Sequence, residues 1–178
     1  MEKIRIPQLI IALFLLLIYP CLVKAGTPGH TINTDMAQSK YQPVVTADRS
    51  TYNEESGLYN LSGNVRIQCE GRLITANNAK INANTLQVWA DGRATITEGE
   101  LTFTSDALYA ELSGNTVWFF GNRCGVERPG LMIHGDNMQY NWKTHIVIFD
   151  GHVLWVHKGK SNTTTHLEFD LEKDDVAR

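Results

Sequence analysis

Histidine, aspartate and asparagine side chains are the groups in this sequence that could bind a metal ion. His152 and His157 lie five residues apart in one segment, so on a β-strand they point to opposite faces, whereas two ligands on one strand need an even spacing. Four short polar residues recur at intervals of 29 or 30 residues and suggest a calcium ladder: Asp48, Asn77, Asp106 and Asp136. Calcium takes about six to eight oxygen ligands, so one side chain per interval is too few. Asx turns that cap their own backbone explain these residues better, and the sequence predicts no metal site.

Catalytic chemistry requires groups with tuned protonation at one place. The sequence has no Ser/His/acid signature, no Gly-x-Ser-x-Gly motif and no phosphate-binding loop. We therefore expect no catalytic residue, no cofactor and no enzyme activity. The formal net charge of −3, without a basic cluster, also argues against a nucleic-acid partner, because phosphate binding needs clustered lysine and arginine.

The first 25 residues have the pattern of a secretory signal peptide. Two basic residues within the first five are followed by an apolar run over residues 9–23. Small residues then stand at the positions that precede a cleavage site before Gly26. The run is only slightly shorter than the ~17 residues that span a bilayer, so an uncleaved anchor remains the alternative. The sequence predicts an exported protein in either case.

One glycine recurs inside segments that otherwise read as β-strands. Glycine weakens a strand interior and marks a bend, a bulge or a close approach. Small, polar and apolar residues keep fixed offsets from each of these glycines, so residues 45–160 contain four aligned units of about 29 residues. The glycines are Gly63, Gly92, Gly121 and Gly151, spaced 29, 29 and 30 residues apart.

Each unit contains a shorter and a longer segment, and the longer one alternates apolar and polar residues with a period of two. That alternation and the many β-branched and aromatic residues are typical of strands with one buried face. Glycines at one level of every long strand would bend the whole sheet there. The sequence therefore predicts an all-β protein: a folded-over, twisted sheet of about four 29-residue, two-strand repeats.

The domain organisation follows from these patterns. Residues 1–25 are the expected signal peptide and 26–43 a polar, flexible lead-in. The repeat domain is expected over residues 44–160, and residues 161–178 are expected to form a short strand and a polar tail.

One parity of the long strands is consistently apolar and should face the interior. Whether this interior is an ordinary core or an unfilled groove stays open at this stage. The residues expected to line it are Leu61, Val65, Ile67, Val88, Ile96, Val117, Phe119, Val147, Phe149 and Trp155. The opposite parity mixes polar and large apolar side chains. Such side chains could cover a sheet edge, contact a partner or pack under a loop. The residues of this parity are Asn60, Trp89, Trp118 and Ile148.

Two cysteines lie beyond the N-terminal segment, Cys69 in the first unit and Cys124 in the third. An exported chain permits a disulfide. If the units stack in order, however, two strand spacings separate these residues, roughly 9–10 Å, and a disulfide needs Cα atoms within about 7 Å. We expect no bridge between them.

The first unit resembles the OstA-type repeat of the LptA family of bacterial lipopolysaccharide transport proteins. The shared pattern is a small residue and Asp (Ala47-Asp48), an aromatic residue (Tyr52), and Gly-Asn-Val opening a strand (Gly63-Asn64-Val65). The resemblance implies a β-jellyroll open at both ends, whose apolar interior holds the acyl chains of lipid A. It also implies a periplasmic role in outer-membrane biogenesis, as a bridge between inner and outer membrane.

The resemblance further implies partners. Members join through edge strands into homo-oligomers and to an inner-membrane LptC-like and an outer-membrane LptD-like protein. The sequence departs from the family pattern in its C-terminal region: residues 166–175 are acidic, whereas the best-known members of the family are more basic there. The identity of the partner at this end therefore stays open. The alternative function is a structural or adhesive exported β-repeat protein with a filled core.

Overall fold

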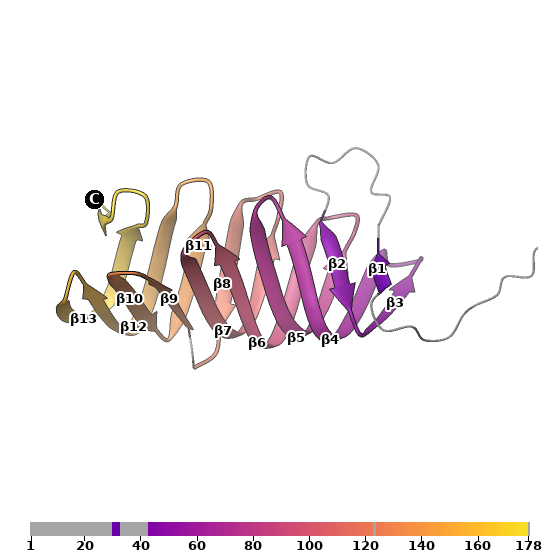
Figure 1. Ribbon diagram of the computed structural model, residues 1–178, viewed down its shortest axis with the longest axis horizontal. Coiled ribbons are helices and arrows are strands. Elements are labelled where there is room, and N and C mark those ends of the chain that lie inside the picture. The colour runs from indigo at the N-terminus through magenta and orange to yellow at the C-terminus, as the bar shows by residue number, and fades with distance from the viewer. Residues whose placement is uncertain (1–29, 33–42, 123, 178) are drawn as a thin grey trace, which may run out of the picture.

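The chain folds into a long, bent β-sheet in a computed structural model that describes residues 30–32, 43–122 and 124–177. Every regular element of the described residues is a strand, which confirms the all-β prediction. Figure 1 shows the strands side by side along the long axis of the molecule, with β1, β2 and β3 at one end and β13 at the other. The expected signal peptide, residues 1–25, lies outside the described residues.

Within the described residues, six long strands and eight short ones form a single sheet of fourteen strands. The long strands are β4 (Leu58–Cys69), β5 (Arg72–Asn82), β6 (Gln87–Glu98), β7 (Leu101–Glu111), β12 (Ile146–His157) and β13 (Lys160–Asp170). The short strands are β1 (His30–Ile32), β2 (Val44–Ala47), β3 (Arg49–Asn53), β8 (Thr116–Phe120), β9 (Cys124–Arg128), β10 (Leu131–Gly135), β11 (Asn137–Asn141) and β14 (Asp175–Val176). Residues 161–178, expected as a short strand and tail, hold most of β13 and all of β14.

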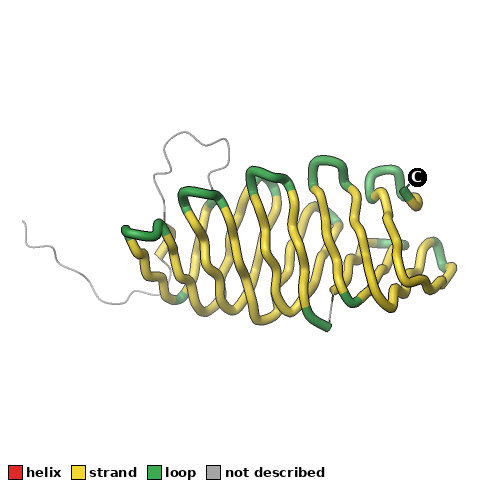
Figure 2. Tube along the Cα trace, turned by 180° about the vertical axis from the view of Figure 1, so that it is seen from behind, coloured by secondary structure: helices red, strands yellow, loops and turns green. Residues whose placement is uncertain are grey.

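The strand pairing is antiparallel throughout and divides the sheet into two layers. The first half of β4 pairs with β3 and its second half pairs with β2; β7 pairs in the same way with β9 and β8, and β12 with β11 and β10. Layer 1 thus contains β1, β2, β9, β10 and one half of each long strand. Layer 2 contains β3, β8, β11, β14 and the other halves. Figure 2 shows the green turns that connect successive strands along one side of the molecule.

The long strands bend where the recurring glycines lie. The pairing register shifts between Ser62 and Val65, between Asp91 and Ala94, and between Asp150 and Val153. Gly92 has a φ of +76° and the next residue, Arg93, has a φ of +64°, so two successive left-handed residues turn the strand. Glycine adopts this conformation without steric cost, which explains why it stands at each bend.

The third unit differs because its strand is interrupted instead of bent. β8 ends at Phe120 and β9 begins at Cys124, with Gly121 between them at a φ of +106°. This unit carries the one extra residue that makes the last glycine spacing 30. Both layers continue across this position, because β7 pairs with β9 in layer 1 and with β8 in layer 2.

The side chains of the Asx residues lie against these corners. A Cβ added to Gly92 would lie 2.8 Å from the Cβ of Asn77, and one added to Gly151 would lie 2.5 Å from an oxygen of Asp136. The Asp48 carboxylate accepts a hydrogen bond from the Asn64 side chain at 2.9 Å, sixteen residues away. Each Asx side chain therefore packs against the corner of the following strand. The constant spacing of fifteen residues reflects this contact across strands.

Candidate functional site

The space between the two layers is the main apolar region of the described structure. Nine of the ten residues that the sequence places inside are buried, and Trp155 is partly buried and packs against them. Leu61, Val88, Val117, Phe119, Val147 and Phe149 lie in layer 2; Val65, Ile67, Ile96 and Trp155 lie in layer 1.

Aromatic rings connect the layers across this interior. Phe103 of layer 1 has its ring centroid 4.5 Å from that of Tyr140 and 5.7 Å from that of Phe119, both in layer 2. Nearer the C-terminal end, Trp155 of layer 1 lies 6.2 Å from Phe169 of layer 2. The two layers are therefore in direct contact.

The shorter segment of each unit supplies interior residues that the site prediction omitted. Ile74, Phe103 and Ile133 are at most 4% exposed and stand three residues before the Asx positions. Their constant apolar character was the signal that could have identified them. Tyr140, also fully buried, occupies the position four residues after the Asx residue.

The two layers also meet along the side opposite the glycine corners, which we call the mouth. In the middle of the mouth, Arg72 of layer 1 pairs with Glu98 at 2.8 Å, and its guanidinium lies 5.2 Å from the ring centroid of Trp142 in the β11–β12 turn. The hydroxyl of Tyr140 in layer 2 donates to the Glu98 carboxylate at 3.0 Å. Burial, and then the charge of Glu98, raise the pKa of the Tyr140 hydroxyl, so it stays a protonated donor.

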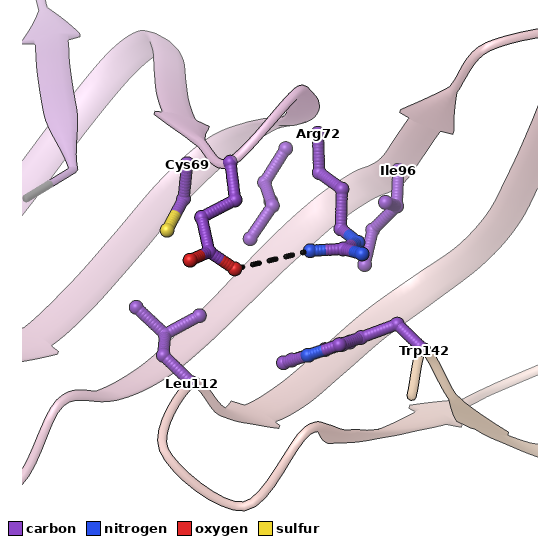
Figure 3. A pocket seen from close by; sticks show the side chains of 7 residues that line it. Cys69, Arg72, Ile96, Leu112 and Trp142 are labelled. Carbon is purple, nitrogen blue, oxygen red and sulfur yellow. Dashed lines mark ion pairs between the residues drawn. The ribbon is translucent and has the colours of Figure 1, made fainter. Parts of the chain in front are cut away.

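A small cavity lies directly inside these mouth contacts. Figure 3 shows Cys69, Ile96 and Leu112 around it, with the planar ring of Trp142 below Arg72. Its volume of about 20 Å³ is room for a single water molecule. Side chains therefore fill the interior in this structure, and a fatty acyl chain would fit only if the layers moved apart.

A second set of contacts crosses the mouth at its C-terminal end. Asp174, in the turn after β13, pairs with Arg128 at 2.6 Å and with Lys158 at 2.7 Å. Hydrogen bonds from Lys158 and His157 lower the pKa of the Asp174 carboxyl well below its usual range. The Arg128 guanidinium also donates to the backbone carbonyl of Leu171 at 2.7 Å. These contacts fix the last turn of layer 2 to strand ends of layer 1.

The histidines considered as metal ligands lie in different surroundings. His152 is exposed at a corner, where its Nδ1 lies 2.7 Å from the Asp136 carboxylate, whereas His157 faces Asp174 at 3.1 Å. Among the described residues, no group of three or more candidate ligands forms a metal site. Cys69 and Cys124 are separate buried thiols, and burial raises the pKa of Cys124 to about 11.

Fold and interior together define a class: bent, two-layered antiparallel β-proteins with an apolar space between the layers. A family model described as the LptA/(LptD N-terminal domain) LPS transport protein matches residues 44–174. The chain belongs to this family. It is a lipopolysaccharide transport protein and not an enzyme.

A solved structure supports the fold assignment. The chain is similar to LptH, titled as the LptA-homologous periplasmic component of the conserved lipopolysaccharide transport device from Pseudomonas aeruginosa, with a TM-score of 0.57 and 17% sequence identity. The match covers 61% of this chain and 82% of that chain. The comparison with curated protein sequences found no match. Within the described residues, no helix has the length and hydropathy that a membrane crossing requires.

Proposed function

We propose that the protein carries lipopolysaccharide by shielding its acyl chains between the two layers. The observation that supports this most is the continuous apolar interior, whose expected lining residues lie on both layers and face one another. A lipid that crosses water exposes hydrocarbon at a cost of about 0.8 kcal/mol per CH₂. Transfer between the layers removes this cost without any chemical step.

Loading requires the layers to separate, because the interior is filled in this structure. The mouth is the natural entrance, since the polar sugar and phosphate groups of the lipid would then stay in water. A chain of about twelve methylenes would gain roughly 10 kcal/mol on burial, which can offset the loss of the Arg72–Trp142 and Tyr140–Glu98 contacts. Leu112 and Ile96, beside the small cavity, would be the first interior residues to meet hydrocarbon.

The ends of the sheet suit assembly into a bridge. β3 has five exposed residues and pairs only with β4 among the described strands, and β14 pairs only with β13. Edge strands add further strands readily. We therefore propose homo-oligomers and contacts with LptC-like and LptD-like proteins, in the periplasm after signal-peptide removal. The acidic C-terminal turn is partly neutralised by the ion pairs of Asp174.

Photo-crosslinking in living cells tests the lipid site with a matched pair. Phe149 is fully buried between the layers, and its neighbour Ile148 points to the outer face of layer 2. A photoreactive phenylalanine at 149 should form adducts with lipopolysaccharide, and one at 148 should form few. Adducts at 148 alone would contradict acyl-chain binding in the interior.

A second function, a structural or adhesive β-repeat protein, is favoured by one observation, the filled interior. In that case the layers never open. Both crosslinking positions would then remain free of lipid in a protein that is folded and exported, whereas the transport proposal requires adducts at 149.

A further inference from the structure

A row of large side chains crosses the outer face of layer 2, away from the interior. Cross-strand pairing places Lys80 opposite Trp89, Trp89 opposite Tyr109, and Tyr109 opposite Trp118. The ring centroids are 5.3 Å apart for Trp89 and Tyr109 and 5.5 Å apart for Tyr109 and Trp118. Val88 and Ala90, on either side of Trp89, are buried, so the Trp89 ring must project outward.

The row ends at a depression of about 470 Å³ over β4, β5 and β6. This volume lies within the range of small-molecule sites, about 300–1,000 Å³. Trp89 lines the depression and is 39% exposed, so its ring is accessible to a ligand there. The other outward-facing side chains around it are Leu58, Asn60, Asn78, Lys80 and Asp91.

Contacts within the site hold several of these groups in place before any ligand arrives. The Asn78 side-chain amide donates to the Asp91 carboxylate at 2.9 Å. Trp89 lies beside Tyr109, whose hydroxyl donates to Glu111 at 2.7 Å. Because ordering side chains on binding costs free energy, a preformed arrangement favours recognition of a small ligand.

The chemistry of the lining selects a class of ligand. The amides of Asn60 and Asn78 each donate and accept hydrogen bonds, Lys80 donates, and Asp91 accepts. Hydroxyl groups match this mixture because each hydroxyl also donates and accepts. The opposite charges of Lys80 and Asp91 balance, so the site does not select an ion. A wholly apolar ligand would cover the polar groups of Asn60 and Lys80 without offering them a hydrogen bond.

We propose that this depression binds an uncharged saccharide of one or two pyranose rings. The face of a pyranose ring carries C–H groups, which pack against the negative π face of an indole, here that of Trp89. Its hydroxyl groups hydrogen-bond to Asn60, Asn78, Lys80 and Asp91. This site is separate from the lipid interior, since layer 2 lies between them, and it does not depend on the proposed transport role.

Indole NMR signals test the proposal on the intact, unmodified protein, which has four tryptophans. We would titrate ¹⁵N-labelled protein with N,N′-diacetylchitobiose and with maltose, both uncharged disaccharides, using sodium phosphate and a short fatty acid as controls. At least one saccharide should shift the Trp89 indole signal and leave those of Trp142 and Trp155 in place. If neither saccharide moves the Trp89 signal, or if phosphate or the fatty acid moves it equally, the proposal is wrong.

Two matched variants extend the test. Trp89→Ala should weaken saccharide binding about tenfold or more, as expected for the loss of one aromatic stacking contact. Trp118→Ala removes a tryptophan from the same row that does not line the depression, so its affinity should change less than about twofold. Lys80→Ala, at an exposed position, weakens binding without a change of fold. Equal affinities in wild type, Trp89→Ala and Lys80→Ala would overturn the assignment.

Discussion

Replacing Gly92 with alanine should destabilise the protein by about 3 kcal/mol, because two separate costs add at this corner. Gly92 has a φ of +76°, and a residue with a Cβ pays about 1–2 kcal/mol in the left-handed region. The new Cβ would also lie 2.8 Å from the Cβ of Asn77 and 2.9 Å from its amide nitrogen. Overpacking of this kind costs roughly 1–3 kcal/mol.

Gly71 provides a control that separates the two costs. Its φ is +81°, close to that of Gly92, but an added Cβ would have no neighbouring atom within 4 Å. Gly71→Ala should therefore lose only the backbone share, about 1–2 kcal/mol. Urea unfolding followed by circular dichroism measures both variants against wild type, with equal m-values as the check that the compared states are the same.

The test is the difference between the losses of stability that Gly92→Ala and Gly71→Ala cause. If Gly92→Ala costs no more than Gly71→Ala, the Asx side chains do not support the corners. The fifteen-residue spacing would then need another explanation.

Three further predictions concern the mouth, the C-terminal turn and a buried thiol. Tyr140→Phe removes the hydroxyl that donates to Glu98 and should cost about 1 kcal/mol in urea unfolding; unchanged stability would show that this contact does not hold the layers together. Because the pKa of Asp174 is lowered in the folded state, its carboxylate stabilises the last turn above the ordinary carboxyl pKa of about 4 and loses this effect as the pH falls through the lowered value. At neutral pH, Asp174→Asn should therefore speed hydrogen exchange of the Ala177 amide, which donates to the backbone carbonyl of Glu168 at 2.8 Å. The same exchange rate in both proteins would refute this role of Asp174. Burial raises the pKa of Cys124 from 9.0 to about 11, so between these pH values the folded state keeps a proton that the unfolded chain loses. The free energy of unfolding should therefore fall from about pH 9 to 11. Cys124→Ala should reduce this dependence of stability on pH.

The corners could be predicted from the sequence because their cause is local. Glycine adopts the left-handed conformation without steric cost, and four such glycines in register indicate one corner per unit. The following residue is also left-handed, but the sequence did not show this, since Asn64, Arg93 and His152 share no residue type. These residues follow the conformation that the preceding glycine makes possible.

The partners of the Asx residues could not be predicted, because they depend on strand register. Asp48 and Asn64 are distant along the chain and meet only since β2 and β3 pair with opposite halves of β4. The pattern of fifteen residues was visible, whereas the contact that causes it was not. The expectation of local Asx turns did not include this contact between strands.

The residues of the interior were predicted from the alternation of apolar and polar residues, but the packing of the interior was not. Period-two alternation identifies the buried parity of each strand, and the burial of Ile67, Val88 and Phe149 agrees with it. How closely the layers approach depends on the joint volume of rings from distant strands, such as Phe103 and Tyr140. The mouth contact between Arg72 and Trp142 joins residues seventy positions apart, and no local pattern indicates it.

Valine methyl groups allow the most direct test that acyl chains enter between the layers. Val65, Val88, Val117 and Val147 are at most 1% exposed and lie inside, whereas Val44 is 47% exposed and Val156 lies on the outer face. We would label valine methyls and add a lipid A analogue with a spin label at the end of one acyl chain. The account predicts that interior valine signals broaden while those of Val44 and Val156 remain sharp. Broadening of Val44 and Val156 alone, with the interior signals unchanged on saturation, would contradict it.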